Sequence, residues 1–88
     1  MADPRITRDA VLEAINSPKN RRRIRWTAST TLPTMGIEFY PNFSKANYRR
    51  MNVVLKGLLS EGFLAARPAM QSNYTYKEVA YERSNYRP

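Results

Sequence analysis

The chain of 88 residues contains neither cysteine nor histidine, and it holds only three glycines. Without cysteine it has no disulfide, thiolate metal site or thiol nucleophile, and without histidine it also lacks the commonest general base. The acidic residues show no paired-carboxylate spacing, and no glycine-rich phosphate loop is present. We therefore expect a protein that is not an enzyme and that needs no metal, cofactor or small-molecule ligand.

Long hydrophobic runs are absent as well. Apolar residues make up 42% of the chain, which is enough for a core, but the mean hydropathy is -0.64 and no segment is apolar enough to suggest a transmembrane span. The first ten residues, MADPRITRDA, contain two acids and no apolar stretch of the kind found in signal peptides. We expect one small soluble domain inside the cell, in the cytoplasm or nucleoid, or in the nucleus of a eukaryote.

Basic residues outnumber acids by fifteen to seven, and their distribution is uneven. Between residues 14 and 60 there are nine basic residues and one acid, so this segment alone carries an excess equal to the whole net charge of +8. Such an excess is expected if one face of the protein meets a polyanion, and a solvated basic surface is the alternative.

The first predicted element is a helix over residues 8–16. Thr7 has the character of its N-cap, Asp9 complements the positive end of the helix dipole, and Ile6 with Val11 has the spacing of a hydrophobic staple. Pro18 closes the segment. The run KNRRRIRW follows, and we interpret its beginning as a flexible basic loop and residues 24–26 as a short strand that places Ile24 and Trp26 on one face.

A short second helix is predicted to pass through Leu32 and Met35, with Thr30 or Thr31 as its cap. Pro33 then has to lie near the first turn, and Gly36 ends the helix. Residues 36–43, GIEFYPNF, are predicted to form an aromatic loop, because Pro41 prevents a helix from running through them.

The third predicted helix is long, begins at a cap on Asn42 or Ser44, and ends at Gly62. Its apolar stripe should face the core and its basic ridge the solvent, with Tyr48 and Arg50 beside the ridge. The stripe consists of Ser44, Tyr48, Met51, Leu55, Leu58 and Leu59, flanked by Val54 and Gly62, and the ridge consists of Lys45, Arg49, Asn52 and Lys56.

The C-terminal part, FLAARPAM and YTYKEVAYE, is predicted to form two strands joined by a tight turn at QSN. Pro68 suggests an edge position or a bulge in the first strand. We expect residues 1–5 and 84–88 to be flexible ends around a single domain over residues 6–83.

The order of these elements resembles the winged-helix variant of the helix-turn-helix. The most specific local piece is LKGLLSEGFLAARP, in which spaced leucines are followed by a polar step, a glycine and an apolar pair, as at the end of a winged-helix recognition helix. The resemblance implies an α+β fold with three helices, a short strand after the first helix, and a C-terminal two-stranded hairpin as the wing.

In that fold the helix over residues 44–61 would enter the major groove of DNA, and the hairpin tip would touch the backbone or the minor groove. Arg49 and Asn52 have the donors to read guanine and adenine, and the other cations suit phosphate contact. The candidate DNA-binding residues are Lys45, Tyr48, Arg49, Arg50, Asn52 and Lys56 in the long helix, Lys19, Arg21, Arg22, Arg23 and Arg25 in the basic run, and Gln71 and Asn73 at the hairpin tip.

The sequence therefore predicts a small basic protein that binds double-stranded DNA, as a transcription regulator or a DNA-organising accessory factor. A module of this size gains affinity by pairing, so a homodimer is expected. Two alternatives stay open at this point. One is an RNA- or ribosome-binding winged helix, and the other is an adaptor or inhibitor whose basic face docks an acidic protein partner.

Overall fold

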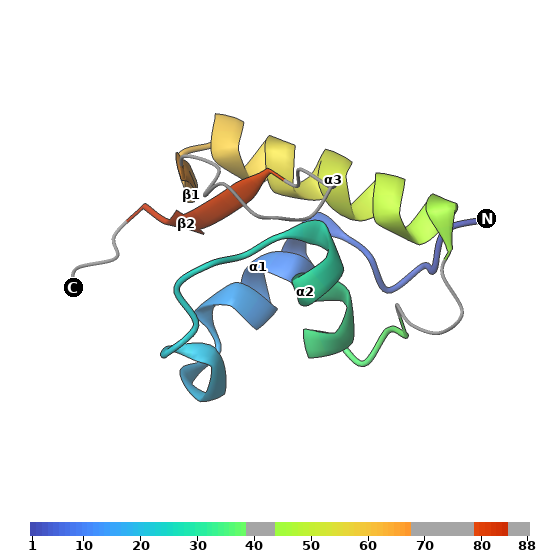
Figure 1. Cartoon of the computed structure of the whole chain (residues 1–88), viewed down its shortest axis with the longest axis horizontal. Coiled ribbons are helices and arrows are strands. Elements are labelled where there is room, and N and C mark those ends of the chain that lie inside the picture. Colours follow the sequence, from blue (N-terminus) through green and yellow to red (C-terminus); the bar gives the residue numbers. More distant parts are fainter. Residues whose placement is uncertain (39–43, 68–78, 85–88) are drawn as a thin grey trace, which may run out of the picture.

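The computed structural model describes residues 1–38, 44–67 and 79–84. In this part of the chain it shows an α+β domain with three α-helices and a two-stranded antiparallel sheet, as the sequence predicted. Helix α3 lies along one side, α1 and α2 pack beneath it, and the sheet lies near the C-terminal end of α3 (Figure 1). No described helix is long and apolar enough to cross a membrane. The elements are α1 (Arg8–Asn16), the 3-10 turn η1 (Pro18–Asn20), α2 (Ala28–Thr34), α3 (Lys45–Ser60), β1 (Leu64–Arg67) and β2 (Ala80–Arg83).

Helix α1 has the predicted bounds and the predicted cap. The Thr7 hydroxyl accepts a hydrogen bond from the Ala10 amide at 3.2 Å, and Ile6 and Val11 are both buried on the two sides of the cap. After the helix, the backbone turns through η1, where the side-chain amide of Asn20 donates to the Ala14 carbonyl at 2.8 Å. The basic run thus begins in a hydrogen-bonded turn. The prediction that this part of the chain is a flexible loop was wrong.

The predicted strand over residues 24–26 is reduced to a single bridge. Trp26 and Tyr81 exchange two backbone hydrogen bonds of 2.8 Å, whereas Ile24 is 37% exposed and does not share the buried environment of Trp26. The reason lies in Arg83, whose guanidinium bonds the carbonyl of Arg23 at 3.1 Å. Before Trp26, the backbone of the chain therefore bonds the Arg83 side chain of β2 and does not pair with the backbone of β2.

Helix α2 begins earlier than predicted. Its cap is Thr27, and Thr27 and Thr30 form a capping box in which each side chain accepts from the backbone amide of the other, at 3.2 and 3.0 Å. Thr30 and Thr31 are thus helical residues, and neither is the cap. Because the helix starts at Ala28, Pro33 is its sixth residue, so the prediction that it lies near the first turn was wrong.

Two glycines end α2 and α3 in the same way. Gly36 and Gly62 have positive φ angles of 76° and 87°, which residues with a side chain rarely adopt. At the end of α3 the Phe63 amide donates to the Leu58 carbonyl at 3.0 Å, and the equivalent bond of the same length closes α2. Both glycine stops were predicted correctly.

The core forms between the three helices and the sheet. Helix α3 is capped by Ser44, one of the two predicted caps, and it contributes the predicted apolar stripe with Val54 inside it as well. Tyr48 and Leu59 are partly buried at the edge of this stripe. The buried core cluster comprises Ile6, Val11, Ile15, Trp26, Ala28, Leu32, Ile37, Met51, Val54, Leu55, Leu58, Leu64 and Tyr81.

The two strands pair antiparallel, with Leu64 opposite Arg83 and Arg67 opposite Ala80. This agrees with the predicted strand pair over the residues that the structure describes. The predicted tight turn at residues 71–73 lies outside them. Because Tyr81 of β2 also pairs with Trp26, the sheet is joined to the chain between α1 and α2.

Candidate nucleic-acid interface

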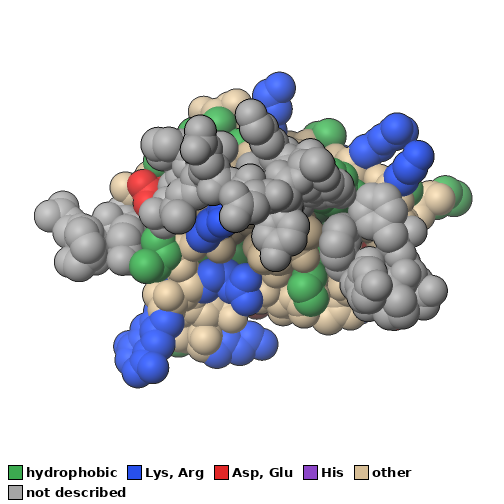
Figure 2. Space-filling model, viewed as in Figure 1, with side chains coloured by type: hydrophobic (Ala, Val, Ile, Leu, Met, Phe, Trp, Pro, Cys, Tyr) green, Lys and Arg blue, Asp and Glu red, His purple; other side chains and the backbone are tan. Residues whose placement is uncertain are grey.

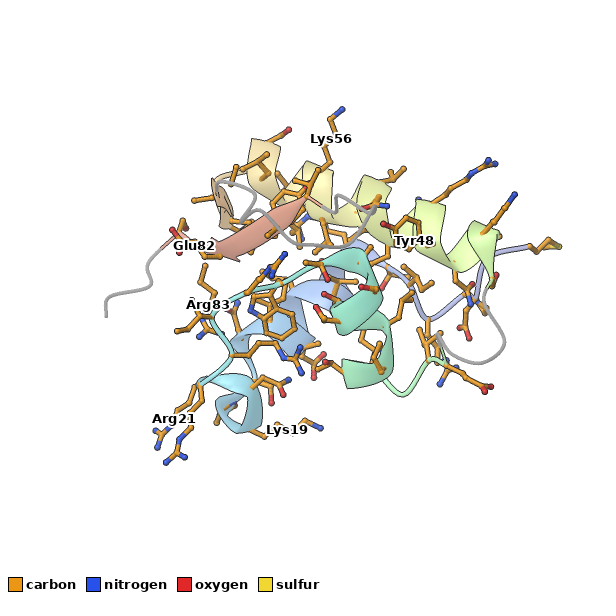
Figure 3. The ribbon with its side chains drawn as sticks, viewed as in Figure 1. Lys19, Arg21, Tyr48, Lys56, Glu82 and Arg83 are labelled. Atoms are coloured by element: carbon orange, nitrogen blue, oxygen red, sulfur yellow. The ribbon has the colours of Figure 1, made fainter. Side chains whose placement is uncertain are left out.

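The exposed side of α3 carries three basic side chains and one exposed valine. Opposite the buried stripe, Lys45, Arg49 and Lys56 are all exposed, and Val53 between them is 60% exposed. Lys56 projects away from the rest of the domain (Figure 3). We call these four residues the α3 face.

Val53 is the member of the α3 face that sequence reasoning missed. A valine in a helix is normally assigned to the core, because burial of its side chain is favourable. Its spacing contained the contrary signal: at 100° per residue, Val53 falls within about 60° of both Arg49 and Lys56 around the helix axis, on the side away from Leu55.

The remaining predicted residues of α3 lie on its flanks. Tyr48 is half-buried and packs against the core cluster, and Asn52 is half-buried beside it on the same flank. Arg50 lies on the opposite flank, where its Nε donates to the Ile6 carbonyl at 3.2 Å and so holds the segment before α1. The structure therefore groups Lys45, Arg49 and Lys56 on the exposed side and leaves the other three at its margins.

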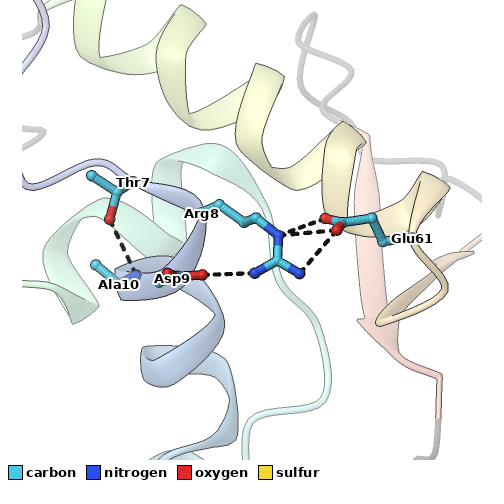
Figure 4. Close-up of polar contacts among 5 residues, drawn as sticks. All are labelled: Thr7, Arg8, Asp9, Ala10 and Glu61. Atoms are coloured by element: carbon cyan, nitrogen blue, oxygen red, sulfur yellow. Dashed lines mark hydrogen bonds and ion pairs between the residues drawn. The ribbon is translucent and has the colours of Figure 1, made fainter.

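The acid nearest to the end of α3 is neutralised by α1. Arg8 donates to both carboxylate oxygens of Glu61, at 2.8 and 2.9 Å, and its remaining terminal nitrogen bonds Asp9 at 2.6 Å (Figure 4). The Arg8 guanidinium holds the pKa of the Glu61 carboxyl below its ordinary value. Since α3 itself contains no Asp or Glu, no unpaired carboxylate on α3 or at its C-cap opposes the cations of the α3 face.

A second group of cations lies in and after η1. Lys19, Arg21 and Arg22, which we call the basic turn, are exposed and take part in no ion pair among the residues that the structure describes. Arg25 is exposed in the same way. Arg23 differs, because its guanidinium carbon lies 5.3 Å from the centroid of the buried Trp26 ring.

The backbone of the basic turn is fixed by one arginine from β2. Arg83 donates to the carbonyls of Ile15, Arg21 and Arg23 at 2.9, 2.7 and 3.1 Å. Its guanidinium thereby satisfies a free carbonyl in the last turn of α1 and two carbonyls of the basic run at once. No pattern in the sequence indicates this contact, because the bonded residues are 60 to 68 positions apart in the chain.

The basic residues do not form one face. Lys56 projects from one edge of the molecule, whereas Lys19 and Arg21 project from the opposite edge (Figure 3). The space-filling view shows Lys and Arg side chains at both of these edges (Figure 2). The labelled members of the two basic groups thus project in opposite directions.

Gln71 and Asn73, the predicted contacts at the hairpin tip, lie outside the described residues. Within the described ranges no three His, Cys, Asp or Glu side chains gather in a group that could hold a metal ion. Comparisons with protein-family models, with curated proteins and with solved structures gave no match. The function therefore has to be argued from the residues of this chain.

Proposed function

We propose that the protein binds double-stranded DNA by inserting the α3 face into the major groove, as a transcription regulator or a DNA-organising factor. The order of elements supports this reading. A helix, a bridge at Trp26, a short helix, a long helix and a strand pair follow one another as in the winged helix that the sequence resembles. In helix-turn-helix proteins the last helix of the motif enters the major groove.

The observation that carries the proposal is the exposure of three cations on one side of a helix without an opposing acid. Lys45 and Lys56 are eleven residues apart, which is about 16 Å along a helix axis at 1.5 Å per residue. A helix fits into the major groove, which is about 12 Å wide, with its charged side chains reaching the phosphates on both walls. The lengths of Lys and Arg side chains suit that arrangement.

Duplex DNA fits the α3 face better than duplex RNA does. The major groove of A-form RNA is deep and narrow and does not admit a helix, whereas that of B-form DNA does. Because Lys56 projects away from the domain, a groove can approach this side of α3 without meeting α1 or α2 (Figures 1 and 3). This geometry favours DNA.

Each side chain of the α3 face has a role in the proposal. Arg49 faces the floor of the groove, where it can donate two hydrogen bonds to guanine, and Asn52 at the margin suits adenine. Lys45 and Lys56 contact phosphates. Val53 provides an apolar surface for the methyl group of thymine, which is the one apolar feature of the major-groove edge.

A salt series tests the proposal. Affinity for a short DNA duplex should fall with increasing salt with a log–log slope of about -2, because each of the two phosphate-contacting lysines contributes about 0.9. The double variant Arg49→Gln, Lys56→Gln should reduce the magnitude of that slope by about one, through Lys56, and should weaken binding further through loss of the Arg49 contact with guanine. The matched control is Arg21→Gln, Arg22→Gln, which removes the same charge from the opposite edge and should leave the slope near that of the parent.

Two results would contradict the proposal. One is parental affinity and slope in the Arg49→Gln, Lys56→Gln protein, if circular dichroism shows that it is folded. The other is displacement of the labelled DNA by double-stranded RNA more readily than by unlabelled DNA, which would favour the RNA-binding alternative. Pairing of two copies on DNA stays a prediction.

A further inference from the structure

We propose that one molecule bridges two DNA duplexes, with the α3 face on one duplex and the basic turn on the other. This inference rests on the proposed DNA binding by α3 and goes beyond it. Lys56 on one side and Lys19 with Arg21 on the other project from opposite edges of the domain (Figure 3). A single straight duplex that lies against one edge cannot reach the other.

The size of the molecule supports two duplexes over one that wraps around it. The domain measures 35 × 32 × 24 Å along its principal axes. Figure 3 is viewed down the shortest axis, so the two basic groups at its opposite edges are separated across the longer dimensions of the domain. A duplex touching both would have to turn through roughly half a circle. Because elastic bending energy rises with the square of the angle, that turn costs about four times as much as the ~90° bends that strongly DNA-bending proteins impose.

The basic turn has the structure of a prepared phosphate-binding surface. Like charges so close together repel each other, yet a further guanidinium, that of Arg83, is placed among them to bond the carbonyls of Arg21 and Arg23. Additional backbone bonds, from Arg21 to Pro18 and from Arg23 to Asn20, shape the same turn. A run that served only solubility would need no such fixed backbone. A fixed one lowers the entropy lost when phosphates bind.

The two surfaces would bind DNA in different ways. The basic turn carries only cations, which contact phosphates and read no sequence, whereas the α3 face also carries groups that reach base edges. The first duplex would thus be selected by α3, and the second could have any sequence. Two such surfaces on one molecule suit a protein that holds distant DNA segments together.

A sandwich capture experiment on the full chain tests the bridge. A biotinylated duplex is immobilised, saturated with the protein and washed, and a fluorescent duplex of random sequence is then added. The parent should retain the second duplex. The variant Arg21→Gln, Arg22→Gln should load on the first duplex as the parent does and retain at least about tenfold less of the second, because two phosphate contacts are lost.

The outcomes separate the bridge from the proposed function. If the parent does not load on the first duplex, DNA binding itself fails. If the parent loads and retains no second duplex, the bridge is overturned while DNA binding by α3 stands. If the Arg21→Gln, Arg22→Gln protein retains as much second duplex as the parent, the basic turn is not the second surface and capture comes from pairing of protein copies. Competition by an acidic polypeptide but not by DNA at the second step would also overturn the bridge, in favour of a protein partner.

Discussion

Replacement of Arg83 with methionine should loosen the basic turn and destabilise the whole domain. Methionine keeps most of the apolar stem but removes all three hydrogen bonds to the carbonyls of Ile15, Arg21 and Arg23. The bond to Ile15 is partly buried, and the other two are exposed. The effect therefore reaches from β2 to the end of α1.

The magnitude follows from these three bonds. A hydrogen bond with a charged donor contributes about 1.5–3 kcal/mol when it is shielded, and much less when water competes. Counting the Ile15 bond in full and the exposed bonds only in part, the free energy of unfolding should fall by about 2 kcal/mol. For a domain of this size that corresponds to a decrease in Tm of roughly 8–16 °C.

The assay is thermal and denaturant unfolding followed by the fluorescence of Trp26, which is the only tryptophan and is fully buried. The matched control is Arg25→Met, which removes the same charge at an exposed arginine and should change the stability by less than about 0.5 kcal/mol. Arg83→Lys should fall between the two, because an ammonium cannot reach three separated carbonyls. Equal stability of the Arg83→Met and Arg25→Met proteins would refute the role of Arg83.

Two further predictions concern the helix end and the N-terminal segment. Gly62→Ala should destabilise the domain by about 1–2 kcal/mol, because a left-handed φ of 87° is strained for alanine although a Cβ would meet no atom there. Gly57→Ala, inside α3 with equally open space, should stabilise the domain by about 0.5–1 kcal/mol. If chemical denaturation showed that both substitutions change the stability in the same direction, the assignment of Gly62 as the helix stop would be contradicted. The Arg5 guanidinium lowers the pKa of Asp3 to about 2 from an ordinary value of 3.8, so the ionised carboxylate stabilises the folded state above about pH 4 and this contribution is lost as the pH falls toward 2. An NMR titration of the Asp3 carboxyl with a midpoint near 3.8 would show that the ion pair does not form in solution.

The features that the sequence predicted best are those with local causes. The start of α1 follows from the cap on Thr7, and the ends of α2 and α3 follow from Gly36 and Gly62. In each case the deciding hydrogen bonds span three to five residues, so the relevant chemistry is visible in a short window. The start of α2 was missed because two threonines beyond Thr27 offered equally good caps.

The candidate site was predicted in part. The exposed cations of α3 follow from the helical period, since the buried leucines fix which side faces solvent. The place of Arg50 did not follow, because its partner is the Ile6 carbonyl, 44 residues away in the chain. The same distance in sequence hid the contact between the Asp3 amide and the Asn47 side chain, which holds the first residues against α3.

The sequence by itself determined the order of the three helices and the C-terminal strand pair, which side of α3 is buried, and that the excess positive charge belongs to the middle of the chain. Those properties depend on the spacing of neighbouring residues and on composition. Only the tertiary structure decided that this charge is divided between two opposite edges and that Arg83 fixes one of them. The direction in which a side chain projects depends on how the helices and the sheet pack, and packing joins residues that are far apart in the sequence.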